Sequence, residues 1–170
     1  MGSASARKIR IPQSVDMQIR ISLKSDTITP DLRKKIMSVK DPTPALREAG
    51  TVAAKMAVDA FTDPSLRPTT WPDIKDSTKK RKQSSAILID SDTMHRSPRL
   101  IEAAPTHALV GSDRLAGSHS LAAIHQLGAP KAHIPPRPFF PFFASGEATE
   151  TAKTRIREVI ADWFNSVLKS

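Results

Sequence analysis

The chain has 170 residues, a formal net charge of +9 and no cysteine, a length that suffices for one hydrophobic core but not for two full-sized domains. Without cysteine it can form no disulfide, no thiolate metal site and no cysteine nucleophile. No apolar run approaches the ~18 residues of a membrane-spanning helix, and the basic N-terminus lacks the apolar core of a secretory signal, so we expect neither feature.

The excess of positive charge favours contact with a polyanion or with acidic protein surfaces, and it does not select between them. Residues 1–16 contain Arg7, Lys8 and Arg10 and predict a flexible basic arm. The arm is either an unstructured extension or a segment that orders on a neighbouring subunit. Residues 17–170 are then expected to form a single domain.

The first predicted elements are a strand and two helices. Apolar and polar side chains alternate through residues 17–23, which is the period of a half-buried strand. A short helical stretch follows over 31–39. Thr43 is a candidate N-cap with Pro44 at the first helical position, and small apolar residues then recur at helical spacing. We therefore predict an amphipathic helix over 43–62 that a neighbouring element can approach closely.

A polar, proline-punctuated region follows over residues 64–85 and carries a basic run at 79–82. The run is expected either to be a solvated face or to contact nucleic-acid phosphates. No aromatic residue interleaves with it, so stacking on single-stranded nucleic acid is not supported.

Three further predictions complete the fold. Two β-like pieces lie within residues 99–112, and a short helix is predicted over 121–127. The last element is an amphipathic helix over 146–168, with Ser145 as a plausible cap. The predicted fold class is α+β, a small antiparallel sheet packed with two main amphipathic helices, at about 43–62 and 146–168, and joined by long loops.

The most unusual stretch is residues 134–143, which holds four of the six phenylalanines among several prolines. Proline excludes a helix and weakens a central strand, so an extended segment is predicted. Burying one ring is worth ~1.5–3 kcal/mol, so the rings must be covered, either by the chain's own core or by a neighbouring subunit. We favour the neighbour. The candidate interface residues are Arg137, Phe139, Phe140, Phe142 and Phe143, together with Arg7, Lys8 and Arg10 of the arm.

Arg137 lies between two prolines and so has a fixed backbone around it. Its planar guanidinium is expected to bind a carboxylate or the C-terminal carbonyls of a helix.

Signals for catalysis and for metal binding are weak. No helical ligand spacing relates the five histidines, which are His95, His107, His119, His125 and His133. His125 is expected to be hydrogen-bonded near a loop. Asp90 and Asp92 could form an acid/base pair, although turn chemistry explains them better. We expect no catalytic residue, no cofactor and no metal ion.

Short motifs occur in an order that matches a known family. Trp71-Pro72 with Thr78 downstream is similar to the pattern W-x-x-L-x-x-x-T. Residues 88–91 are similar to L-I-D-T/S-G-x-L, with Ser97 matching the serine that follows. Residues 110–112 are similar to V-G-T/S.

Two more motifs form a distinctive pair. Residues 122–128, AAIHQLG, are similar to Y-A-x-I-H-Q-F-G, and residues 134–139, IPPRPF, are similar to I-P-A-R-P-F. On this series the chain resembles, over roughly residues 17–168, the phage virion morphogenesis, or tail completion, family of Mu-like and P2-like phages. The matching residues are Trp71, Asp90, Ser97, Gly111, His125, Gln126, Gly128, Pro135, Arg137, Pro138 and Phe139. The chain departs from the pattern at Asp92, Leu121 and Leu127, where the family has Gly, Tyr and Phe.

The resemblance implies a structural virion protein rather than an enzyme, namely a tail completion or tail terminator subunit of the head–tail junction. Such subunits assemble into a ring, commonly a hexamer, that caps the tail tube and joins it to neck or head-completion proteins. Genome DNA passes through the lumen without sequence recognition. The implied location is the virion, after assembly in the cytoplasm of the bacterial host, with no membrane partner.

Two alternatives stay open: a head-side neck adaptor and, from a different class, a basic DNA-binding protein. Because a strongly positive lumen would hold DNA rather than let it slide, we expect most Lys and Arg side chains to face outward or to meet protein carboxylates.

Overall fold

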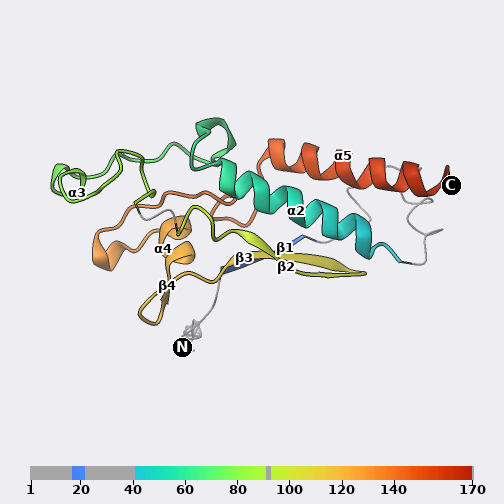
Figure 1. The fold of residues 1–170 in the computed structure, drawn as a ribbon, viewed down its shortest axis with the longest axis horizontal. Coiled ribbons are helices and arrows are strands. Elements are labelled where there is room, and N and C mark those ends of the chain that lie inside the picture. The colour runs from blue at the N-terminus through green and yellow to red at the C-terminus, as the bar shows by residue number, and fades with distance from the viewer. Residues whose placement is uncertain (1–16, 22–40, 91–92, 170) are drawn as a thin grey trace, which may run out of the picture.

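A computed structural model of the chain describes residues 17–21, 41–90 and 93–169. The fold is α+β: a three-stranded antiparallel sheet in the order β1-β3-β2 packs against helices, and a separate small hairpin pairs β4 with β5 (Figure 1). The strands are β1 (Met17–Ile21), β2 (Arg99–Ala104), β3 (His107–Ser112), β4 (Leu115–Ala116) and β5 (His119–Ser120). The helices are α2 (Thr43–Asp59), α3 (Asp76–Lys79), α4 (Leu121–Leu127) and α5 (Glu150–Val167), with 3-10 turns η2 (Pro64–Leu66) and η3 (Pro130–Ala132).

Several predictions fall on residues that the structure does not describe. These are the basic arm 1–16 with Arg7, Lys8 and Arg10, the helix over 31–39, the last two residues of the strand 17–23, and Asp92. Within the described part of the chain, no helix combines the length and the apolar character that crossing a membrane requires.

The sheet follows the alternation in the sequence. Met17, Ile19 and Ile21 of β1 are half-buried while Gln18 and Arg20 are exposed, so the predicted strand is confirmed over the described residues. The two β-like pieces of 99–112 are confirmed as the antiparallel pair β2 and β3, and β1 pairs with the other side of β3.

Helix α2 begins at Thr43 but is not capped by it. Pro42 is the N-cap residue, and the backbone N–H of Thr43 donates to Asp41 Oδ1 at 3.0 Å. The prediction of Thr43 as the cap was therefore wrong by one position. The helix ends at Asp59 rather than 62. Arg67 binds the chain at this end, donating from Nε to the carbonyl of Ala60 at 2.7 Å and from Nη2 to that of Phe61 at 3.1 Å.

Helix α2 is the central layer of the molecule, between the sheet and α5 (Figure 1). Its small side chains allow this, as the sequence predicts. A methyl group built on Gly50 would lie 2.6 Å from Leu100 Cδ1 and 3.0 Å from Ala108 Cβ, so the helix lies closely on the sheet there. Ala45 and Ala49 face the other way and form a buried cluster with Ile160 and Phe164 of α5.

Helix α5 is shorter at its N-terminus than predicted. It begins at Glu150, and Thr149 is its cap, accepting from the N–H of Ala152 at 3.3 Å. Ser145, the predicted cap, instead accepts from the N–H of Glu147 in the preceding turn. The amphipathic character of the helix is confirmed, because Ala152, Ile160 and Phe164 are its buried residues.

Candidate functional site

The aromatic segment, residues 134–143, runs in an extended conformation along the core, as predicted. It forms no helix, and its β-type pairing within the described chain consists of isolated bridges, between Ala129 and Ile134 and between Phe142 and Ala148. The rings of Phe139 and Phe140 are 0% exposed within the single chain. Our assignment of these two rings to a subunit interface is therefore corrected: they are core residues.

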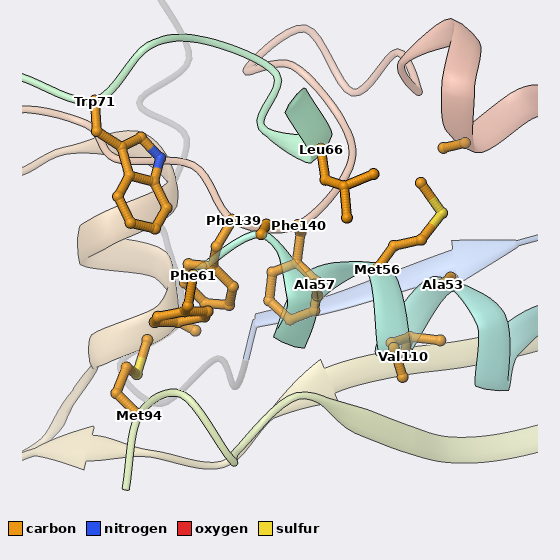
Figure 2. Packing of buried hydrophobic residues seen from close by; sticks show 14 residues of the cluster. Ala53, Met56, Ala57, Phe61, Leu66, Trp71, Met94, Val110, Phe139 and Phe140 are labelled. Carbon is orange, nitrogen blue, oxygen red and sulfur yellow. The ribbon is translucent and has the colours of Figure 1, made fainter. Parts of the chain in front are cut away.

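The buried rings pack against the end of α2 (Figure 2). The ring centroid of Phe139 lies 4.9 Å from that of Phe61 and 4.7 Å from that of Phe140, and Trp71 meets Phe61 edge to face at 5.8 Å. Such tilted and edge-on pairs suit the charge distribution of aromatic rings. Farther along the segment, Phe142 is half-buried, and Phe143, at 39% exposure, is the one ring of the four that faces solvent.

Gln126, on the short helix α4, holds the backbone of the aromatic segment. Its Oε1 accepts from the N–H of Phe139 at 3.1 Å and from that of Phe140 at 3.0 Å. Its Nε2 donates to the carbonyl of Phe140 at 3.3 Å and to that of Phe142 at 2.9 Å. Buried Gln126 thus satisfies backbone groups that have no ladder partner. The helix itself is confirmed where it was predicted, with Ser120 as its cap.

Arg137 and Trp71 join the aromatic segment to the polar region. Arg137, 6% exposed, donates from Nε to the carbonyl of Pro72 at 2.8 Å and from Nη2 to that of Asp73 at 2.9 Å. In return, Trp71 Nε1 donates to the carbonyl of Pro138 at 2.7 Å. We call these three hydrogen bonds the clamp. Arg137 therefore binds loop carbonyls, not the carboxylate or helix end that we predicted, and its burial removes it as an interface residue. It is Arg67 that binds the carbonyls at the C-terminal end of a helix, α2.

Two other motif residues support the sheet. Ser97 Oγ donates to the carbonyl of Met94 at 2.7 Å, so the hydroxyl of Ser112, 2.7 Å away, supplies the proton for the bond between the two serines. A methyl group built on Gly111 would lie 2.4 Å from the carbonyl oxygen of Met17, so only glycine lets β1 lie this close to β3.

His125 precedes Gln126 and behaves differently from our prediction. Its Nδ1 is buried without a hydrogen-bond partner, while its backbone carbonyl accepts from the N–H of Arg137 at 2.6 Å. Burial, with a smaller contribution from the charge of Arg137, lowers the pKa of His125 to about 4. The side chain is therefore a neutral packing group at neutral pH.

The remaining motif residues have local roles. Gly128 ends α4 with a positive φ of 79° and lies against Pro136. Pro138 is buried and Pro135 is exposed. Asp90 Oδ1 accepts from the N–H of Gln83 at 3.0 Å, a contact across seven residues of the loop rather than the local turn bond favoured for it above.

The polar region forms a long loop whose middle carries the basic run. We call residues 75–82 the basic loop; it contains α3 and lies at the end of the molecule opposite the C-terminal end of α5 (Figure 1). Lys79 pairs with Asp73 at 2.5 Å, which raises the pKa of Lys79 and lowers that of Asp73. The Lys82 ammonium donates to the carbonyl of Ala86. The run at 79–82 indicated this region of the sequence but did not include Lys75, which lies four residues before the run.

The described residues contain no group of three or more His, Asp or Glu side chains that could hold a metal ion. A shallow, open depression of about 400 Å³ lies beside the aromatic segment, lined by Leu127, Gly128, Pro130, His133, Ile134, Pro135 and Pro136. Apart from histidine, this lining offers no side chain suited to acid/base or nucleophilic chemistry.

Comparisons with protein families, with curated proteins and with solved structures found no match to this chain. We therefore infer function from the residues and the contacts themselves.

Proposed function

We propose that the chain is a structural virion protein of a phage head–tail junction, a tail completion or tail terminator subunit that forms a ring on the tail tube and joins it to the neck. The observation that supports this most is the convergence of the motif residues. Trp71, Gln126 and Arg137 come from separate motifs, and all of them bind the backbone within or beside the aromatic segment.

The chemistry of these contacts suits a scaffold. The polar atoms of Trp71, Gln126 and Arg137 are directed at backbone groups of the same chain, across up to 67 residues of sequence. Groups used in this way position segments rather than bind a reacting molecule. A subunit that transmits load between a tube and a neck needs such long-range fixation of its loops.

Ring formation has to use surfaces other than the buried rings. Among the described residues, the exposed large apolar side chains are scattered over several elements: Ile101, Leu115, Leu127, Phe143, Val167 and Leu168. Such single exposed residues are ordinary on a monomer, and they are apolar contacts that this part of the chain offers to neighbours. The basic arm with Arg7, Lys8 and Arg10 is the other candidate contact.

The test is assembly on tail tubes. The full chain is mixed with tubes built from the tail-tube protein encoded near its gene, and the mixture is imaged in negative stain. We expect rings at the tube ends, and light scattering should report an oligomer of ring size. A chain that stays monomeric and ignores the tubes would overturn the proposal.

The same experiment distinguishes the head-side neck adaptor from the tail-tube placement. If rings bind purified portal or neck complexes and leave the tubes bare, the subunit is a neck adaptor and the tail-tube placement is wrong. An antibody against the chain, located on intact virions, provides the independent position.

A further inference from the structure

The basic loop and the three residues that follow it hold no apolar side chain, between Ile74 and Ala86. Residues 75–85 read KDSTKKRKQSS, with five cations and one acidic residue. A surface that binds another protein normally has aromatic or aliphatic anchors at its centre. The phosphate backbone of nucleic acid needs only cations and hydroxyl donors. The composition therefore fits the phosphate backbone of a nucleic acid better than the surface of an acidic protein.

The five cations of this stretch fall into two groups, those bound within the chain and those left for an outside partner. Lys79 and Lys82 are engaged within the chain, by Asp73 and by the carbonyl of Ala86. Lys75 and Lys80 are exposed and have no carboxylate partner among the described residues. Exposed Arg81 donates its Nε to the carbonyl of Ser77 at 3.2 Å, and its terminal amino groups make no hydrogen bond to the described part of the chain.

The loop is held firmly at its base while its tip is solvated. The clamp fixes residues 71–73 through the carbonyls of Pro72 and Asp73 and through Trp71 Nε1. On the far side, the N–H of Gln83 binds the carboxylate of Asp90. The loop therefore presents its cations from a fixed position at one end of the molecule (Figure 1), which lowers the ordering cost of binding.

We propose that the basic loop binds the phosphate backbone of duplex DNA through Lys75, Lys80 and Arg81, without reading base sequence. Single-stranded DNA is disfavoured because no aromatic side chain is present in the loop for base stacking. An anionic lipid surface is disfavoured because the loop has no apolar residue to insert. The inference goes beyond the virion role and holds whether or not the chain forms rings.

The experiment measures binding of the full chain to a short fluorescent duplex of mixed sequence, over roughly 50 to 200 mM salt. The test variant is K75Q/K80Q/R81Q. The matched control is R47Q/R155Q/R157Q, which removes the same three charges from exposed positions on α2 and α5. We expect the test variant to lose about tenfold or more in affinity. The slope of log K against log salt should flatten by about 2–3, since each phosphate contact contributes about 0.9. The control should change little.

Three results would overturn the proposal. Equal losses in both variants would mean that net charge alone drives binding. An unchanged test variant would place the contact elsewhere. Polyglutamate or phosphatidylserine vesicles that bind as tightly as the duplex, and lose as much on the triple substitution, would mean a general anion surface.

A second measurement does not depend on the variants folding. In the unmodified chain, duplex DNA should slow amide hydrogen exchange across residues 76–82 and leave α5 unchanged. Protection on α5 with none on the loop would reject the site. Because neither assay involves tails, a failure here leaves the proposed ring function standing, and failed ring assembly leaves this site standing.

Discussion

The side chain of Gln126 makes the hydrogen bonds to the backbone of the aromatic segment that a neighbouring strand would make in a sheet. The prolines around Phe139 and Phe140 prevent a regular ladder, yet the backbone of both residues is buried with their rings. An unpaired buried backbone group costs about 1–3 kcal/mol. Gln126 accepts from two backbone N–H groups and donates to two backbone carbonyls. The aromatic segment can therefore be buried although its prolines prevent strand pairing.

The lowered pKa of His125 predicts that the protein loses stability in mild acid. Its pKa is about 4 in the folded chain and about 6.5 in an unfolded one. Between these values the unfolded state binds a proton and the folded state does not, so the free energy of unfolding falls as pH falls from about 6.5 to about 4. Above that window the group contributes no pH dependence. The total loss should be roughly 3 kcal/mol, since each of the about 2.5 pKa units is worth about 1.4 kcal/mol.

The measurement is the urea midpoint as a function of pH for the wild type, for His125→Leu and for His119→Gln, an exposed control in β5. His125→Leu should flatten the curve in this window, and His119→Gln should leave it unchanged. The carboxyl of Asp113, whose pKa is lowered by its hydrogen bond to Arg99, acts only at lower pH. Identical slopes for the wild type and His125→Leu would refute the assignment.

Phe139 and Phe143 should differ strongly in how much stability is lost when each is truncated to alanine. Phe139 is enclosed and Phe143 is partly exposed. Phe139→Ala leaves a cavity and should lower the free energy of unfolding by about 3–5 kcal/mol, whereas Phe143→Ala should cost less than about 1 kcal/mol. Chemical denaturation of both variants gives the comparison, with Phe139→Leu as a milder substitute if the alanine variant does not fold. Similar costs at the two positions would contradict the core assignment.

At the scale of elements, periodicity predicted β1, β2, β3 and the two main helices, including the start of α2 at Thr43, but not where α2 ends or where α5 begins. Ala148 lies one turn before Ala152 and so continues the apolar stripe of α5, yet residues 146–149 lie outside the helix. Gly146 has a φ of 85°, Phe142 bridges Ala148, and the N–H of Phe143 binds the carbonyl of Glu147. A helical period reports one face of a segment and carries no information about such pairing with another segment.

The packing of α5 predicts that it opens before the sheet does. Two of its three buried side chains, Ile160 and Phe164, form a cluster with α2 that is separate from the main core, and only Ala152 at its N-terminal end lies in the main core. Phe164→Ala should therefore cost about 3–4 kcal/mol, and it should speed hydrogen exchange in α5 more than in β3. Val167→Ala, at an exposed position near the end of the same helix, is the matched control and should cost less than about 1 kcal/mol. Exchange that accelerates equally in α5 and β3 would show that α5 does not open separately.

Across the whole molecule, what the sequence could not reveal is contact over long separations. The extended course of residues 134–143 was readable from the prolines. What covers the rings was not, because Trp71 and Pro138 are 67 residues apart and Arg137 and Pro72 are 65 apart. Nothing local to either segment indicates such a pair. Many of the described Lys and Arg side chains are exposed in the single chain, and Arg137 is buried. Their orientation relative to a ring lumen stays a prediction.

The clamp has a consequence for how this architecture could diversify. It holds the base of the long loop through hydrogen bonds made inside the protein, so the residues at the tip of the loop contribute little to the stability of the fold. Homologous chains could then exchange, lengthen or recharge that tip at little thermodynamic risk, and an engineer could splice a foreign epitope there for display at one pole of the subunit.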